Sequence, residues 1–303
     1  MPSPLFSFNS YAKDIYSQDG ADGIIDEILR RINSPENIER KWCVEFGAWD
    51  GIYLSNTYNL IKNHGYSAVL IEANTQKYLE LCKNIPQDDA IKINKFVTFE
   101  GSNTLDKLLS ETGMPKDFDF LSIDIDGNDY HVLDSIESLR PKLICIEFNP
   151  CIPNEVEFIQ VKDFNVKHGS SAKSIWQLAR RKGYALVATT DVNLFFIDRC
   201  YLEKIGIEQE LTLDELRDDS RFKVYIFSGY DGTVFTSKPF TVWWHGLTIA
   251  DKSLQQLPLS LRRFPSDYNP IQKILFRFFS FFKNPQSYLE KRAERVRKRQ
   301  LLK

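Results

Sequence analysis

The chain has 303 residues, of which 43% are hydrophobic and 26% charged, so it can bury a full core and is not expected to be disordered. The formal net charge of -2 conceals an asymmetry, because the segment from Arg262 onward holds 12 Lys and Arg against 3 Asp and Glu. This segment carries +9 and the preceding residues -11, which argues against a nucleic-acid-binding face on the body of the protein.

Neither a targeting signal nor a disulfide pattern is evident. Residues 1–14 lack the basic start and apolar run of a signal peptide, and no stretch approaches the ~18 apolar residues of a membrane span. The five cysteines form no CxxC pair, and Cys43 and Cys145 lie in apolar runs, which indicates buried thiols in a reducing compartment. The sequence therefore predicts a cytoplasmic protein.

The first regular element expected is a helix over residues 22–32, where Ile and Leu recur at helical spacing and residues 34–37 end the helix. Short β-type runs then alternate with helical patterns, which is typical of βαβ units in a parallel sheet covered on both faces. The predicted strands are residues 42–46, 68–71, 91–96, 118–123 and 143–148, and the predicted helices are 55–62, 76–83, 104–109 and 130–136.

The second half of the chain completes this domain and extends it. A helix at about residues 170–182 and strands over 184–189 and 193–198 bring the sheet to seven strands. We therefore predict an α/β fold, Rossmann-like and doubly wound, with a mostly parallel seven-stranded sheet. The expected parts are an N-terminal helical cap (1–40), the Rossmann-like core (41–200), an aromatic lid or extension (201–260) and basic amphipathic C-terminal helices (261–303).

The strongest functional signal is the pattern Glu45-x-Gly47-x-x-x-Gly51 directly after the first strand. Glycines are needed there because the backbone must turn sharply and approach a ligand closely. Glu72 ends the next strand about twenty residues later, where a carboxylate can accept the hydroxyl protons of an adenosine ribose. The competing interpretation is an ordinary strand-to-helix turn with an incidental surface glutamate.

The spacing of the glycines favours S-adenosylmethionine (SAM) over a dinucleotide. A dinucleotide fingerprint reads GxGxxG and admits a pyrophosphate near a helix N-terminus, whereas here Ala48, Trp49 and Asp50 separate the glycines. Glu45 and Asp50 make the loop acidic. Acidic groups attract the amino and sulfonium groups of SAM and repel a pyrophosphate.

These motifs resemble those of the class I SAM-dependent methyltransferases, and among them the FkbM-type enzymes often found in polysaccharide and antibiotic gene clusters. The resemblance covers roughly residues 17–246. It is carried by residues 17–24 (Ser-Gln-Asp-Gly-Ala-Asp-Gly-Ile), 44–51, 70–74, 118–130 and 146–149, and Gly169-Ser170-Ser171 and Gly183-Tyr184 match in order and spacing.

The resemblance implies a methyl donor held at the carboxyl ends of the first strands, with Glu72 on the ribose and Asn103 close to the adenine. The expected cofactor-binding residues are Glu45, Gly47, Trp49, Asp50, Gly51, Glu72, Asn103 and Asp124. Family members generally methylate hydroxyl groups, often on sugars. The expected activity is therefore O-methylation of a sugar or a surface-glycan precursor.

A second group of polar residues closes the fourth and fifth strands: Asp124 and Asp126, and Glu147 and Asn149. Residues two apart on a strand share a face, so four oxygen ligands are expected to converge. The set resembles that of catechol-type O-methyltransferases, which implies a Mg²⁺ or Mn²⁺ ion that lowers the pKa of the acceptor hydroxyl. In the metal-free alternative Asp126 or Glu147 is the general base, and in the plainest interpretation these residues cap helices.

Among the four histidines, His168 follows the fifth strand and is the further candidate for the catalytic base at neutral pH. We therefore name Asp126, Glu147 and His168 as candidate catalytic residues. His64 and His131 are expected to be ordinary helix or surface residues.

The C-terminal segment is expected to form an amphipathic helix over residues 270–283, followed by a basic helix that includes residues 291–299. Its apolar face suits docking onto the domain or a second subunit, or contact with an anionic membrane at the inner surface. Homo-oligomerisation is compatible with the first option. Nucleic-acid binding is disfavoured because the body is acidic.

Three other functions compete with O-methylation. A catalytically inactive methyltransferase-fold module would bind a partner through its basic tail, and would bind SAM without turnover or not bind it at all. A nicotinamide-dependent sugar oxidoreductase is disfavoured by the missing GxGxxG motif. N-methylation is compatible with the same motifs.

Overall fold

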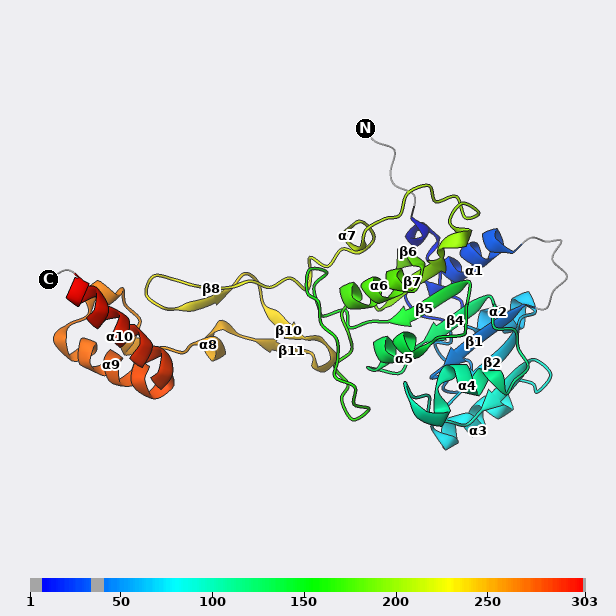
Figure 1. Ribbon diagram of the computed structural model, residues 1–303, viewed down its shortest axis with the longest axis horizontal. Coiled ribbons are helices and arrows are strands. Elements are labelled where there is room, and N and C mark those ends of the chain that lie inside the picture. Colours follow the sequence, from blue (N-terminus) through cyan, green and yellow to red (C-terminus); the bar gives the residue numbers. More distant parts are fainter. Residues whose placement is uncertain (1–6, 34–40, 302–303) are drawn as a thin grey trace. The chain divides into compact units, whose positions relative to one another are not determined.

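The computed structural model describes residues 7–33 and 41–301, without the side chains of residues 295, 296 and 298–301 (Figure 1). Residues 34–37, which we expected to end the first helix, lie outside the described residues. The chain divides into two compact units, Met1–Phe222 and Lys223–Lys303. The first unit contains the large sheet, and the second contains two hairpins and the C-terminal helices.

The first unit is built on a seven-stranded sheet with the order β3-β2-β1-β4-β5-β7-β6. Neighbouring strands are parallel except at β7, which runs antiparallel to both β5 and β6. The predicted α/β fold with a mostly parallel sheet is therefore confirmed. The strands are β1 (Trp42–Phe46), β2 (Ser67–Ile71), β3 (Ala90–Ile93), β4 (Phe120–Ile123), β5 (Leu143–Glu147), β6 (Tyr184–Thr189) and β7 (Asn193–Asp198).

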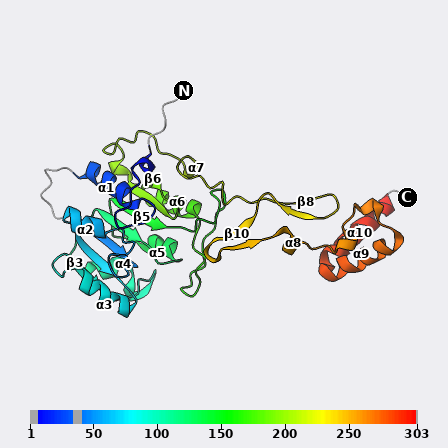
Figure 2. The same cartoon turned by 180° about the vertical axis from the view of Figure 1, so that it is seen from behind.

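Helices cover both faces of this sheet, as the two opposite views show (Figures 1 and 2). Alternate strand residues point to opposite faces: Val44 and Phe46 pack with α4, α5 and α6, whereas Cys43 packs with α1, α2 and α3. Cys43 and Cys145 are buried free thiols, as predicted. The helices are α1 (Ala21–Ile32), α2 (Tyr58–His64), α3 (Thr75–Asn84), α4 (Leu105–Ser110), α5 (Asp129–Ser135), α6 (Ala172–Arg181) and α7 (Leu213–Leu216).

The helix predicted over residues 55–62 begins later, at Tyr58. The hydroxyl groups of Ser55 and Thr57 donate hydrogen bonds to the carboxylate of Glu45 instead of lying on a helix surface. A tertiary contact therefore shortens this helix at its start, which local sequence preference does not reveal.

The first unit extends to Phe222, beyond the end of the core that we predicted at residue 200. Leu211, Leu213 and Leu216 are buried in the same core cluster as α4, α5 and α6. Residues 201–222 therefore belong to the core and not to a separate lid. The predicted N-terminal cap is also part of the core, because α1 buries its apolar face in the cluster on the other side of the sheet.

The second unit consists of two antiparallel hairpins and a pair of helices. β8 (Ile226–Ser228) pairs with β9 (Val234–Thr236), and β10 (Phe240–Val242) pairs with β11 (Leu247–Ile249). After the short α8 (Asp251–Leu254) come α9 (Pro270–Lys283) and α10 (Pro285–Leu301), which lie side by side in both views (Figures 1 and 2). Within the described ranges, no helix combines the length and the apolar character that a membrane crossing requires.

Candidate active site

The carboxyl ends of β1, β2, β4 and β5 meet at one edge of the sheet. In the strand register, Phe46 pairs with both Ile71 and Ile123, and Ile123 pairs with Ile146. The strand order reverses between β1 and β4, and open α/β sheets bind ligands beside such a reversal. The next residue along each of these four strands therefore lies at the expected ligand position. These residues are Gly47 after β1, Glu72 after β2, Asp124 after β4 and Glu147 at the end of β5.

The loop after β1 has an unusual backbone. Gly47, Trp49 and Gly51 all have positive φ, a backbone conformation that residues with a Cβ rarely adopt. A Cβ at position 47 would lie 2.0 Å from the backbone oxygen of Asp124, and a Cβ at position 51 would lie 2.5 Å from the Leu81 side chain. The two glycines thus let the loop pack directly against the end of β4 and against α3.

Glu45 is buried beside this loop, and its carboxylate is bonded within the protein. Oε2 accepts hydrogen bonds from the hydroxyl groups of Ser55 and Thr57 at 2.6 Å each, and Oε1 accepts one from the backbone N–H of Asn56 at 2.9 Å. Burial raises the pKa of Glu45, and these hydrogen bonds partly oppose the shift. Glu45 therefore supports the segment that leads into α2, and its direct contact with a cofactor stays a prediction.

Glu72 is also buried and joins the β1 loop to the end of β2. Its Oε2 accepts a hydrogen bond from the backbone N–H of Trp49 at 2.8 Å, and its Oε1 accepts one from the N–H of Asn74 at 2.6 Å. Each carboxylate oxygen keeps a further lone pair that a ligand hydroxyl can use. Asp50, in the same loop, accepts hydrogen bonds from the N–H groups of Ile52 and Tyr53 and so shapes the turn.

Three carboxylates gather at the ends of β4 and β5. One oxygen from each of Asp124, Asp126 and Glu147 lies within 4.8 Å of the other two. Burial and the negative charge of Asp126 raise the pKa of Asp124 to about 6. Burial and the charge of Asp124 raise the pKa of Glu147 well above its usual value, and Asp124 and Glu147 share a hydrogen bond.

A fourth carboxylate, Asp129, belongs to the same group and was not among our predicted site residues. It is buried at the start of α5, where its oxygens accept hydrogen bonds from the N–H groups of Ile125 and Gly127 at 2.9 and 2.8 Å. Burial and the charge of Asp124 raise its pKa to about 7. A sequence signal was available, because Asp124, Asp126 and Asp129 fall within six residues.

Gln160, which the sequence analysis did not identify, holds the segment that follows β5 through hydrogen bonds of its side chain. Its buried side-chain oxygen accepts hydrogen bonds from the N–H groups of His168 and Gly169, and its amide nitrogen donates one to the carbonyl of Val166. An added Cβ at Gly127 would lie 3.0 Å from the same oxygen. Gln160 therefore holds residues 166–169 close to the end of β4, a contact that no local sequence pattern indicates.

The remaining predicted residues of this cluster have partners in the same segment. The side chain of Asn149 donates a hydrogen bond to the carbonyl of His168 at 2.7 Å and accepts one from the N–H of Cys151 at 2.9 Å. The imidazole of His168 is exposed. Asp126, which has positive φ, forms an exposed ion pair with Lys167 at 3.1 Å.

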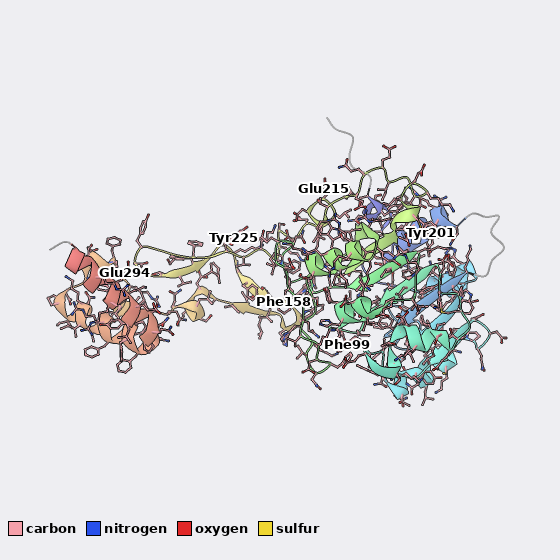
Figure 3. The ribbon with its side chains drawn as sticks, in the orientation of Figure 1. Phe99, Phe158, Tyr201, Glu215, Tyr225 and Glu294 are labelled. Atoms are coloured by element: carbon pink, nitrogen blue, oxygen red, sulfur yellow. The ribbon has the colours of Figure 1, made fainter. Side chains whose placement is uncertain are left out.

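An aromatic group lies between the loops after β3 and β5. Phe99, labelled in Figure 3, stacks on Phe164 with ring centroids 4.7 Å apart, and Phe96 meets Phe164 edge-on at 4.8 Å. His131 lies 5.7 Å from Phe99 and is buried, with Nε2 2.6 Å from the carbonyl oxygen of Gln160. His131 is therefore a helix residue of α5, one of the two alternatives that we expected, and it is buried and not at the surface.

Asn103 is the predicted residue least connected to the others. It lies in a 3₁₀ turn, Gly101–Asn103, where its backbone oxygen accepts a hydrogen bond from the N–H of Thr98 and its side-chain oxygen accepts one from Ser102. The hydrogen bonds found among the described residues do not link Asn103 to the strand-end cluster. Its contact with the adenine stays a prediction.

Residues 100–186 match the family model of the methyltransferase FkbM domain. They include the ends of β4 and β5 with the three clustered carboxylates. This segment is a methyltransferase domain of the FkbM type. The β1 loop and Glu72 precede the matched residues but belong to the same sheet and to the same compact unit. The protein is a SAM-dependent methyltransferase.

Solved structures of methyltransferases resemble the domain at low identity. They include M. capricolum TrmK in complex with S-adenosylhomocysteine (12% identity, TM-score 0.37, 58% of this chain and 67% of that one), the mitomycin 7-O-methyltransferase MmcR (15%, 0.33, 58% and 53%) and a SAM-dependent methyltransferase from Aquifex aeolicus (8%, 0.35, 57% and 87%). No curated protein matches the chain.

Proposed function

We propose that the protein transfers the methyl group of SAM to a hydroxyl oxygen of a saccharide or of a surface-glycan precursor. The observation that carries this proposal is the carboxylate cluster of Asp124, Asp126 and Glu147 beside the β1 loop. A neutral hydroxyl group must lose its proton as it attacks the methyl carbon, and a carboxylate whose pKa is raised toward neutrality is suited to accept that proton.

The cofactor is proposed to lie across the β1 loop and the end of β2. The two glycines let the backbone approach it, and the free lone pairs of Glu72 accept the ribose hydroxyl groups. Trp49 is 45% exposed and has Lys77 Nζ 4.5 Å from its ring centroid, so its indole forms part of the rim. Asp50, Asn103 and Asp124 complete the proposed pocket. Glu45 supports it through its hydrogen bonds to residues 55–57.

The reaction is an in-line displacement. A lone pair of the acceptor oxygen forms the new C–O bond, the C–S bond of SAM breaks, and its electron pair stays on sulfur to give S-adenosylhomocysteine. The hydroxyl proton passes to the Asp124 and Glu147 pair, which titrates as a unit because the two groups share a hydrogen bond. Positioning of donor and acceptor supplies most of the remaining rate enhancement.

The same cluster fits a divalent cation. Three carboxylate oxygens within 4.8 Å of one another are the hard ligands that Mg²⁺ and Mn²⁺ prefer, and the raised pKa values of Asp124 and Glu147 are those of buried carboxylates close to other negative charges. A bound ion would lower the pKa of the acceptor hydroxyl. Asn149 fits less well as a fourth ligand, because its oxygen already accepts the hydrogen bond from Cys151.

Several hydroxyl groups on one acceptor suit this site better than a single isolated one. The cluster offers acceptor oxygens on two neighbouring strands, so adjacent hydroxyl groups of a sugar ring can be held while one of them reacts. His168 and Lys167 lie in the segment beside the cluster and provide polar groups for the rest of such an acceptor. His168 is the second candidate for the base.

The test is methyl transfer from SAM to a panel of mono- and oligosaccharides, with Mg²⁺ and with EDTA. We expect S-adenosylhomocysteine to form and the methyl group to be on oxygen by NMR. Glu147→Gln should keep SAM affinity, measured by calorimetry, and lower kcat by about 10²–10⁴-fold. Glu137→Gln, an exposed residue after α5, is the matched control and should leave kcat unchanged.

Methylation on nitrogen, or normal turnover by Glu147→Gln, would contradict the proposed chemistry. Loss of activity in EDTA that Mg²⁺ restores would assign the cluster to a metal ion. SAM binding without turnover of any acceptor would instead favour an inactive binding module.

A further inference from the structure

The helix α9 carries an apolar stripe that its own unit leaves uncovered. Six large apolar side chains of this helix are between 40% and 77% exposed: Ile271, Ile274, Leu275, Phe278, Phe281 and Phe282. At 100° per residue they fall within an arc of about 120°. They therefore form one continuous face, whereas isolated apolar residues on a protein surface are ordinary.

The opposite side of α9 is already packed. Phe276 lies 5.5 Å from the ring of Tyr268, and the hydroxyl of Tyr268 donates a hydrogen bond to the carbonyl of Leu261. At one edge of the stripe, Phe281 contacts Tyr288 of α10 with ring centroids 5.8 Å apart, and it is the least exposed of the six at 40%. The internal contacts of the unit thus fix which face of α9 is turned outward.

Positive charge surrounds this stripe. The segment from Arg262 onward has 12 Lys and Arg against 3 Asp and Glu. Lys273, Arg277 and Lys283 lie on α9 itself and are exposed. Arg277 lies about 40° beyond one edge of the apolar arc and Lys283 about 80° beyond the other. Exposed basic residues follow on the described part of α10: Lys291, Arg292 and Arg297.

We propose that α9 lies flat on an anionic phospholipid surface, with the apolar stripe in the acyl-chain boundary and the surrounding cations on the lipid phosphates. An aromatic and aliphatic stripe with cations at its edges is the arrangement that interfacial helices use. The helix binds the surface without crossing it, in agreement with the absence of a sufficiently apolar long helix among the described residues. This inference does not depend on the proposed function.

A phosphate-rich surface explains both properties of the segment together. RNA would use the cations but has no use for six uncovered Phe, Ile and Leu side chains on one face. A second copy of the chain would cover the apolar stripe but would bring the same +9 segment against itself if the helices paired.

The test is co-sedimentation of the full chain with vesicles of phosphatidylglycerol or of phosphatidylcholine. We expect binding to phosphatidylglycerol vesicles that weakens as salt is added, and at least about tenfold weaker binding to phosphatidylcholine. Leu275→Ser combined with Phe278→Ser should lower the partition coefficient by about tenfold or more. Leu79→Ser on α3 is the matched control, because Leu79 and Leu275 are both 49% exposed.

Circular dichroism and the unfolding temperature of each variant check that folding is intact, as expected for exposed positions. Equal binding of the double variant and the wild-type protein to phosphatidylglycerol would overturn the proposal. Binding of RNA without binding of these vesicles at low salt would also overturn it. A wild-type dimer in ultracentrifugation that becomes a monomer in the double variant would favour a second copy of the chain and overturn the proposal as well.

Discussion

Single carboxylates in this protein have different roles that their positions in the sequence do not reveal. Glu45 lies within β1, Glu72 directly follows β2, and both are buried. Glu45 accepts hydrogen bonds from the hydroxyl groups before α2, whereas the carboxylate of Glu72 accepts them from backbone N–H groups. With the backbone N–H of Asn56, the carboxylate of Glu45 accepts three hydrogen bonds within the protein, whereas that of Glu72 accepts two. Glu72 is therefore the better candidate for a direct ligand contact.

The substitution Glu72→Gln tests this distinction. The amide nitrogen would replace an oxygen that accepts from the N–H of Trp49 or Asn74, and the charge available to the ribose would be lost. A charge-assisted hydrogen bond contributes about 1.5–3 kcal/mol, so the Kd for SAM should rise about 10- to 100-fold in calorimetry. Glu80→Gln, which removes only the surface ion pair with Lys77, should bind normally. An unchanged Kd for Glu72→Gln would refute the assigned ribose contact.

At the scale of elements, the ends of β4 and β5 and the start of α5 bring four acidic groups together. Asp129 accepts two backbone N–H groups and so fixes the turn between β4 and α5, next to Asp124. The pKa values of Asp124 and Asp129 are raised to about 6 and about 7. Ionisation of these groups in the folded protein therefore lowers its free energy of unfolding.

The pH dependence of unfolding follows from these shifts. Because the folded protein binds these protons more tightly than the unfolded chain, the free energy of unfolding should fall as pH rises from about 4 to about 7. The contribution of Asp129 is on the order of 1 kcal/mol or more, since one pKa unit corresponds to about 1.4 kcal/mol. Urea unfolding in EDTA at a series of pH values measures it.

Asp129→Asn should flatten this dependence, whereas Asp134→Asn, at an exposed position of the same helix, should retain it. Equal slopes for the wild-type protein and Asp129→Asn would show that folding does not raise the pKa of Asp129. Addition of Mg²⁺ at pH 8 should raise the stability of the wild-type protein if the cluster binds the ion.

At the scale of the whole molecule, both core clusters lie within the first unit. Their members come from residues 8–216, and residues 211–216 contribute three buried leucines. The second unit supplies none of these core residues, so the methyltransferase domain does not need it for its hydrophobic core. This division agrees with our proposals of surface attachment for the second unit and methyl transfer for the first.

A chain of residues 1–222 should therefore fold alone and bind S-adenosylhomocysteine with the same Kd as the full chain. A chain of residues 1–200, which ends at the boundary predicted from the sequence, should be much less stable, because it loses Leu211, Leu213 and Leu216 from the core. Each buried leucine contributes about 1.5–3 kcal/mol. Thermal unfolding and calorimetry distinguish these outcomes, and equal stability of the two shortened chains would contradict the assigned boundary.

The sequence alone determined the fold, because the alternating strand and helix patterns and the glycines after β1 are local patterns that do not depend on tertiary contacts. It also located Glu72 and the residues Asp124, Asp126 and Glu147, since the carboxyl ends of parallel strands must meet at one edge. The start of α2, the end of β3 and the burial of His131 were decided by contacts with Glu45, Glu72 and Gln160. Those partners are far apart in the chain, and only the tertiary structure brings them together.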